Sequence, residues 1–234
     1  MIKQTNFETY LYISKNTFNI FVYEKINRKN LYNENLKVDE QFNFQDLNNL
    51  SKFLDDNIFK IEKLIGMFVK NIVLIIHDNK VANLNFGIKK KNYQETISKK
   101  FLESILIDAK DLFKESYQNQ KIMHLIIKKY IIDGNQHLLF DDNLSGDNFC
   151  VELKFISIPN NFQIEIDKVL EKYQIEIIQY FDGSYIKTLF KDEDVSLPEM
   201  IYKVQNGFIE NEVKLIPKNL KKFGFFEKFF QLFS

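Results

Sequence analysis

Glycine, proline, cysteine and arginine are scarce in this chain, and the single cysteine already excludes a disulfide-stabilised protein. The 234 residues hold 7 Gly, 3 Pro and 1 Cys, and Arg28 is the only arginine. Cys150 has no second cysteine to pair with, so no intramolecular disulfide can form. The N-terminus offers no apolar stretch of signal-peptide length. We therefore expect an intracellular protein rather than a secreted one.

An excess of positive charge is also absent. The chain has 32 basic and 32 acidic residues, so its formal net charge is zero. A general nucleic-acid binder needs a basic surplus to neutralise phosphates, so we expect no nucleic-acid partner. The longest aliphatic runs, such as residues 72–76, are far shorter than the roughly 20 residues that cross a bilayer. No membrane-spanning segment is expected.

Apolar and aromatic residues are plentiful, and their spacing predicts a mixed α/β (α+β) fold. Hydrophobic residues make up 45% of the chain, which is enough to bury a sizeable core. Periodicity predicts strands over residues 10–13, 18–24, 31–38, 71–77, 81–88, 122–132, 149–155 and 175–180, and helices over 47–65, 97–112 and 162–173. The order strand, helix, strand favours an α/β arrangement.

Two local patterns refine this prediction. Asp133-Gly134-Asn135 has turn chemistry, with a glycine that tolerates positive φ. The second helix has an apolar face that we expect to pack on a sheet: Ile97, Phe101, Ile105, Ala109 and Leu112. After Phe190 the periodicity weakens, and residues 191–217 are predicted to form a linker.

The last 17 residues, 218–234, form the most informative local pattern. At 100° per residue the phenylalanines gather on one arc of a helix, and four lysines oppose a single glutamate, Glu227. This is typical of an interfacial helix that faces an anionic membrane. The predicted membrane-binding residues are Leu220, Lys221, Lys222, Phe223, Phe225, Phe226, Lys228, Phe229, Phe230 and Phe233. Docking on the protein's own core and binding to a partner protein are the alternatives.

The order of motifs in the second half resembles the bacterial cell-division protein FtsA, a member of the actin-like family. The motifs are Ile122-Met123-His124-Leu125, then Lys129 to Gln136, then Leu144-Ser145-Gly146, a strand ending at Ile158 and a helix that runs into Ile175-Glu176-Ile177. The resemblance covers about residues 8 to 185. It implies an actin-like subdomain 1A over 1–79 and 159–190, with an inserted 1C-type sheet-and-helix subdomain over 80–158. The segment 218–234 is similar to the membrane-targeting helix of that family.

The chain departs from the family where nucleotide phosphates are bound. The first phosphate turn is replaced by Ser14-Lys15-Asn16, which has neither an acidic residue nor a glycine. The family's second loop, rich in Asp and Gly, has no counterpart. Phosphate cradles need backbone N–H groups brought close by small residues. We therefore expect no nucleotide cofactor and no enzymatic activity, the alternative being an actin-like ATPase with degenerate loops.

The resemblance implies a non-catalytic adaptor of the cell-division machinery, peripheral on the inner face of the cytoplasmic membrane at the division site. Division proteins, FtsZ among them, are the implied partners, although subdomain 2B, where the family binds FtsZ, is missing. The family uses 1A and 1C for contacts with neighbouring copies, so self-association is also implied. An actin-like scaffold of a pilus or secretion system is the other interpretation.

No constellation of catalytic or metal-binding residues emerges from the sequence. The three histidines, His77, His124 and His137, lack the spacing of metal ligands, and His124 is expected to be structural. Cys150 is expected to be a buried structural thiol. Asp141, Asp142 and Asp147 form a solvated turn on this interpretation rather than a cation site.

Overall fold

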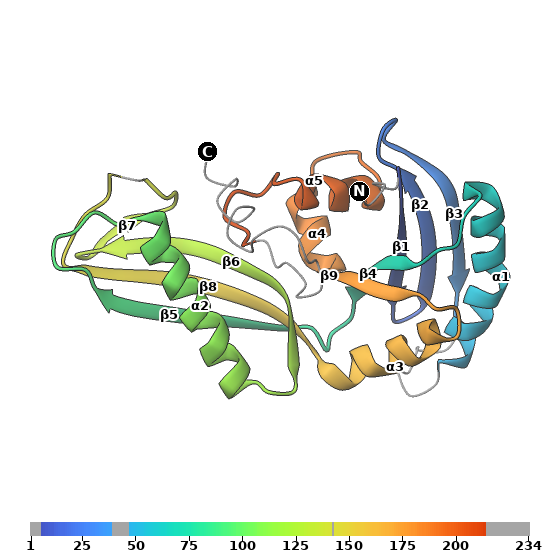
Figure 1. Ribbon diagram of the computed structural model, residues 1–234, viewed down its shortest axis with the longest axis horizontal. Coiled ribbons are helices and arrows are strands. Elements are labelled where there is room, and N and C mark those ends of the chain that lie inside the picture. The colour runs from blue at the N-terminus through green and yellow to red at the C-terminus, as the bar shows by residue number, and fades with distance from the viewer. Residues whose placement is uncertain (1–5, 39–46, 142, 214–234) are drawn as a thin grey trace. The chain divides into compact units, whose positions relative to one another are not determined.

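The computed structural model describes residues 6–38, 47–141 and 143–213. The chain divides into two compact units (Figure 1). Unit 1 comprises Met1–Val81 and Pro159–Asn206, and unit 2 comprises Ala82–Ile158 and Gly207–Ser234. Unit 1 contains a sheet with several helices and unit 2 a sheet with helix α2, so the mixed α/β class predicted from the sequence is confirmed.

Unit 1 is built on a five-stranded sheet with the order β3-β2-β1-β4-β9. The strands are β1 (Phe7–Ser14), β2 (Thr17–Glu24), β3 (Lys29–Lys37), β4 (Asn71–His77) and β9 (Glu176–Asp182). The first three are antiparallel to one another, whereas β4 runs parallel to β1 and β9 runs parallel to β4. A two-residue loop, Lys15-Asn16, joins β1 to β2. The predicted strands in this part of the chain are therefore all present.

Helices cover both faces of this sheet. Phe18 lies against Phe53 of α1 (Asn48–Ile65), with ring centroids 6.1 Å apart. On the other face, Tyr10 and Tyr12 of β1 belong to a buried cluster with Ile186 of α4 (Gly183–Leu189) and with α5 (Leu197–Gln205). Strand side chains alternate between faces, and this alternation puts β1 between two apolar layers.

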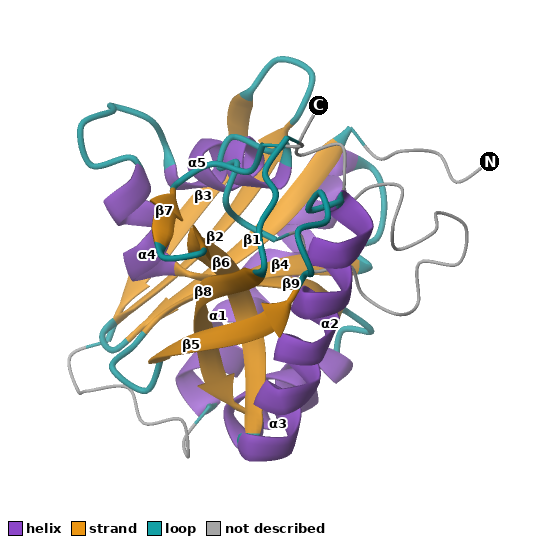
Figure 2. Ribbon diagram, turned by 90° about the vertical axis from the view of Figure 1, so that its left-hand side faces the viewer, coloured by secondary structure: helices purple, strands orange, loops and turns teal. Residues whose placement is uncertain are grey.

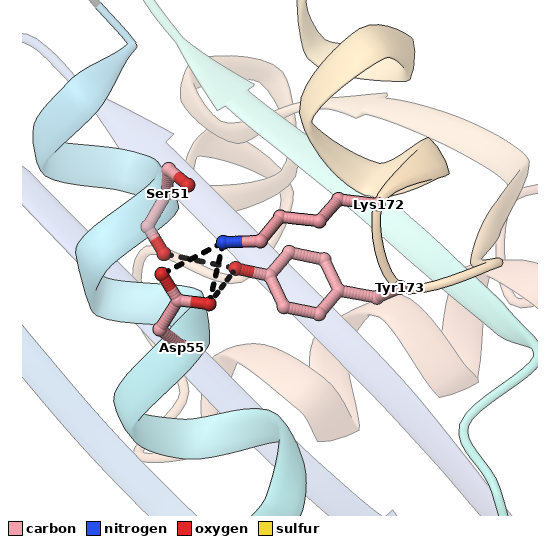
Figure 3. A network of polar contacts seen from close by, with 4 residues as sticks. All are labelled: Ser51, Asp55, Lys172 and Tyr173. Atoms are coloured by element: carbon pink, nitrogen blue, oxygen red, sulfur yellow. Dashed lines mark hydrogen bonds and ion pairs between the residues drawn. The ribbon is translucent and has the colours of Figure 1, made fainter.

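The return of the chain to unit 1 is fixed by a polar network on the α1 surface (Figure 3). Helix α3 (Asn160–Glu171) ends just before Lys172, whose Nζ donates to both carboxylate oxygens of Asp55 at 2.8 and 2.9 Å. The Tyr173 hydroxyl donates to the Ser51 carbonyl oxygen and contacts Asp55 Oδ1 at 2.8 Å. These hydrogen bonds hold the pKa of Asp55 below its usual value. The network joins α1 to the segment that leads into β9.

Unit 2 is a four-stranded sheet, β5-β8-β6-β7, with helix α2 across it (Figures 1 and 2). Its elements are β5 (Ala82–Lys91), α2 (Lys99–Ser116), β6 (Gln120–Ile132), β7 (Asn135–His137) and β8 (Asn148–Pro159). The Ser98 side chain accepts from the Phe101 N–H and starts α2 as an N-cap. The apolar face of α2 and the core-facing side of the strands form one buried cluster: Ile105, Ala109, Phe113, Leu125, Ile127, Tyr130, Phe149, Val151, Leu153 and Phe155 among others.

The turn between β6 and β7 has the predicted chemistry. Asp133 and Gly134 have φ of 47° and 89°, and Ile132 pairs with Asn135 across the two-residue loop. Two successive positive φ angles match the twist of a tight hairpin. A Cβ at Gly146 would clash with the side chains of Ile132 and Asp133, so any larger residue there would force these side chains to shift.

Within the predicted linker over 191–217, the structure shows a helix, and residues 214–217 lie outside the described part of the chain. Residues 197–205 form α5, and Ile201 is fully buried in the core of unit 1. Pro198 occupies the first turn of α5, where a proline is tolerated because its missing N–H has no helical partner. Unit 1 therefore continues to Asn206 rather than ending at residue 190. Nine residues are too few to establish a clear helical period in the sequence.

Two predicted core positions also differ. Leu112 was placed on the buried face of α2, but it is 47% exposed, and Leu102, Leu106 and Phe113 fill that face instead. Cys150 was expected to be buried and is half-buried, because it lies on the side of β8 opposite the cluster that contains Phe149 and Val151.

Candidate functional site

The carboxyl ends of three parallel strands meet at one edge of unit 1. Ser14 of β1 is aligned with His77 of β4, and Ile76 is aligned with Asp182 of β9. Ligands of open α/β sheets bind beyond such ends. A cavity of about 720 Å³ opens there, lined by Tyr12, Ser14, Lys15, Asn16, Thr17, Asn19, His77, Asp78, Asn79, Ser184 and Lys187. This cavity includes the turn where the sequence analysis expects a phosphate loop to be lost.

A chain of three side chains fills one side of this cavity. Lys187 Nζ donates to the Tyr12 hydroxyl at 3.2 Å, and that hydroxyl lies 2.8 Å from His77 Nδ1. Lys187 also lies over the Tyr12 ring, 4.9 Å from its centroid. Burial, with Lys187 as the next cause, lowers the pKa of His77, so this imidazole is neutral at neutral pH.

The two backbone segments that could hold a phosphate at this cavity are the β1–β2 loop and the start of α4. The β1–β2 loop is Lys15-Asn16 and offers no glycine. The start of α4 is capped by the Asp182 carboxylate, which accepts from the N–H groups of Ser184 and Tyr185 at 3.1 Å each. A carboxylate at that position competes with and repels a phosphate. Packing at Gly183 is tight, since a Cβ there would lie 3.2 Å from atoms of Tyr12 and His77.

The predicted membrane-binding residues lie outside the described part of the chain. These are Leu220, Lys221, Lys222, Phe223, Phe225, Phe226, Lys228, Phe229, Phe230 and Phe233. Among the residues that the structure describes, no helix is both long and apolar enough to cross a bilayer. The same residues contain no group of three or more His, Cys, Asp or Glu side chains placed to hold a metal ion.

The segment directly before that tail is attached to unit 2. The Ile127 N–H donates to the Asn211 carbonyl at 2.8 Å, and the Val213 N–H donates to the Leu125 carbonyl at 2.8 Å. Glu212 forms a bridge with Ile126 between these two hydrogen bonds. Val213 itself is 6% exposed and belongs to the core of unit 2. Residues 211–213 are therefore held like a short strand along β6.

A buried histidine reinforces this attachment. His124 Nδ1 lies 2.6 Å from Glu212 Oε1, and the His124 side chain is completely buried. The expected structural role of His124 is therefore confirmed, with Glu212 as its partner. A carboxylate that meets a buried imidazole costs free energy to separate from it. The pair therefore fixes the chain at Glu212, two residues before the undescribed tail begins at residue 214.

Exposed apolar side chains gather at the other end of unit 1. Five large ones lie on α1, on the segment after it and on β9: Phe59, Leu64, Met67, Phe68 and Ile178. Four of them line a cavity of about 1000 Å³ together with Phe7 and Val69. Phe59 and Phe68 are 72% and 76% exposed, which is unusual for phenylalanine and typical of a surface that contacts another protein.

Sequence reasoning missed three parts of these sites. Asp182-Gly183-Ser184 was not singled out, although an acidic residue followed by glycine after a strand is a local signal for a helix start. The apolar surface was not predicted because the sequence does not distinguish the exposed Phe59 and Phe68 from buried phenylalanines in or near a helix. The strand-like pairing of 211–213 depends on backbone hydrogen bonds to β6, which leave no side-chain pattern.

Comparisons with known proteins identify no family from sequence. No protein-family model matches the chain, and no curated protein matches it. Solved structures do show a likeness. One is the PilM–PilN type IV pilus biogenesis complex, at 8% identity and a TM-score of 0.49, where the match covers 78% of this chain and 49% of that one.

Two further structures are similar. The cytoplasmic domain of EpsL, an inner membrane component of the type II secretion system of Vibrio cholerae, has 7% identity, a TM-score of 0.35 and coverages of 77% and 57%. A Bacteroides thetaiotaomicron protein of unknown function with an actin-like ATPase fold has 14% identity, a TM-score of 0.33 and coverages of 84% and 61%. The chain thus spans about half to three fifths of the length of these proteins. At these identities the likeness concerns the fold alone and does not support FtsA in particular.

Proposed function

We propose that this protein is a non-catalytic, membrane-associated scaffold of the actin-like class, held on the inner face of the cytoplasmic membrane by residues 218–234. Cell-division proteins are the proposed partners, with FtsZ the first to be tested. The motifs over residues 122–146 support the division role, because they are the part of the chain that most resembles FtsA.

The observation that carries this proposal is the attachment of Asn211–Val213 to β6. Four residues, 214–217, separate Val213 from the amphipathic segment. A membrane anchor transmits its position to a domain only if the chain between them is short or fixed. Here the backbone hydrogen bonds to β6, the burial of Val213 and the His124–Glu212 contact fix the chain up to residue 213. An anchored tail would therefore place unit 2 directly at the bilayer.

The non-catalytic part of the proposal predicts that ATP does not bind. The Lys15-Asn16 loop lacks the glycines of a phosphate cradle, and Asp182 occupies the first N–H groups of α4. In a thermal unfolding experiment, millimolar ATP with magnesium should leave the midpoint unchanged, since a ligand that binds the folded state raises it. A clear upward shift with ATP, absent with AMP, would show that the cavity is a nucleotide site and would favour the degenerate ATPase.

The partner is tested by recruitment to vesicles. FtsZ alone should stay in solution, and it should float with anionic vesicles when this chain is added. Failure of recruitment, while the chain itself floats, would remove the division role and leave the membrane-associated scaffold. The pilus or secretion interpretation would then be the one to pursue, with cytoplasmic segments of inner-membrane components of those systems as bait.

A further inference from the structure

The sheet of unit 2 has one face that α2 does not cover. Leu84, Phe86 and Ile88 of β5 face the core, so the alternate residues of β5 point to the other side, and Lys89 and Lys91 there are exposed. On β8, Cys150, Glu152 and Lys154 lie on this same side, opposite the core residues Phe149, Val151 and Leu153. Lys129 of β6 joins them through its ion pair with Glu152 at 3.3 Å.

We call Lys89, Lys91, Lys129 and Lys154 the basic face. Acidic side chains lie beside some of them: Glu152 pairs with Lys129, and Asp133 lies near Lys91. Lys89 and Lys154 form no ion pair within the described part of the chain. The surface therefore keeps a positive charge although the whole chain is neutral. A local excess of positive charge attracts an anionic partner, even though the net charge of the whole chain does not indicate one.

The basic face is adjacent to the point where the tail leaves unit 2. Ser157 Oγ lies 3.1 Å from Gln120 Oε1, and Lys129 contacts Glu152, so β6 and β8 run antiparallel. Lys154 accordingly lies beside the middle of β6, the stretch that pairs with Glu212 on its other edge. Neighbouring strands are about 4.8 Å apart, so β8 is roughly 10 Å from the Glu212 segment.

The reach of the tail limits how far this face can be from a bound membrane. Five residues from Val213 to Lys218 span at most about 18 Å when fully extended. Charges near an anionic bilayer act over a Debye length of about 8 Å at physiological ionic strength, and each lysine side chain extends toward the headgroups. This short connection allows the lysines of the basic face to come within range of the lipid headgroups when the tail lies in the interface.

We infer that the basic face is a second contact with the anionic bilayer, which orients unit 2 on the membrane after the tail has inserted. The inference rests on the proposed function, because the tail brings this face to the bilayer. The lipid headgroups are the occupant, since the charge of the face suits an anionic surface and the chain emerges beside it. The phenylalanines of the tail then insert into the bilayer, whereas the lysines of the basic face orient unit 2 and make the binding depend on salt.

The test compares two double charge reversals in the full chain. Lys89→Glu with Lys154→Glu alters the basic face, and Lys60→Glu with Lys63→Glu makes the same change in net charge on exposed positions of α1. We expect the first variant to weaken binding to phosphatidylglycerol-containing vesicles about tenfold. The α1 variant should change it about twofold or less, because α1 belongs to unit 1 and the tail is attached to unit 2. Binding to vesicles of phosphatidylcholine alone should be equal in both.

A milder variant and an independent readout keep the result interpretable. Lys89→Gln with Lys154→Gln should weaken binding less than the reversals, with an unchanged melting temperature. Cys150 lies on the same side of β8, so bound anionic vesicles should slow its modification by a maleimide; burial raises the pKa of this thiol, and the reaction is therefore run in alkaline buffer. In the variant Phe226→Glu with Phe230→Glu, vesicles should not slow the reaction.

The outcomes separate this inference from the proposed function. If the wild-type chain does not bind anionic vesicles, the membrane-associated scaffold is wrong and the inference fails with it. If the wild-type chain binds, but both charge reversals weaken it equally or Cys150 reacts at the same rate with and without vesicles, only the basic face is overturned.

Discussion

Replacing Phe226 and Phe230 by glutamate should abolish binding of the full chain to anionic vesicles. Burying a phenylalanine is worth about 1.5–3 kcal/mol, and an interfacial helix recovers a large part of that for each of its six phenylalanines. Losing two of them and adding two negative charges should lower affinity at least about a hundredfold. Vesicle sedimentation measures the bound fraction, and deletion of residues 218–234 should have the same effect.

Two controls show whether the effect is specific to the tail. Lys221→Gln should only weaken binding and flatten its dependence on salt, because it removes one screened charge and no apolar area. The tail-deleted chain should keep the melting temperature of the full chain. A deleted chain that still sediments with vesicles, or that loses its fold, would assign the segment to the protein's own core.

Replacing Ile105 by aspartate should unfold unit 2. Ile105 is fully buried on α2, in the cluster with Phe113, Leu125 and Phe155. An unpaired carboxylate there loses its hydration and replaces apolar contacts, at a cost of about 4 kcal/mol or more. This is comparable to the whole stability of a small domain. Hydrogen exchange should show loss of protection in β6 and β8 while the amides of β1 and β4 stay protected.

The same helix provides the matched control. Leu112→Asp makes the same kind of change at a position that is 47% exposed, so it should shift the melting temperature only slightly. If neither variant lowers the melting temperature, α2 does not pack on the sheet as the structure has it. If both variants lower the melting temperature by the same large amount, Leu112 is buried, as the apolar spacing in the sequence had suggested.

Long elements could be predicted from the sequence because their periodicity is strong. Residues 72–76 are aliphatic throughout and form the interior of β4, and the apolar spacing from Leu47 to Ile65 predicted α1 to within one residue of its start. The Asp133-Gly134 turn was predictable because few residues accept positive φ. In each case local preference and tertiary packing favour the same conformation.

Short elements and sites formed by distant residues could not be predicted in this way. Helices α4 and α5 have seven and nine residues, too few for a reliable period, and α5 owes its position to the burial of Ile201 against the sheet. The hydrogen-bonded side chains of Tyr12, His77 and Lys187 are distant from one another in the sequence, and none of the three has a local pattern that indicates a site. Glu212 gave no signal at all, because its importance comes from the buried His124 that it meets.

The central claim is that residues 218–234, fixed to unit 2 at Val213, hold this protein at the membrane. The most direct measurement is fluorescence imaging of the full chain, labelled at its N-terminus, in dividing rod-shaped bacterial cells. The account predicts fluorescence at the cell periphery, enriched at the division site, and its dispersal when Phe226 and Phe230 are changed to glutamate. Uniform fluorescence of the unaltered chain throughout the cytoplasm would contradict it.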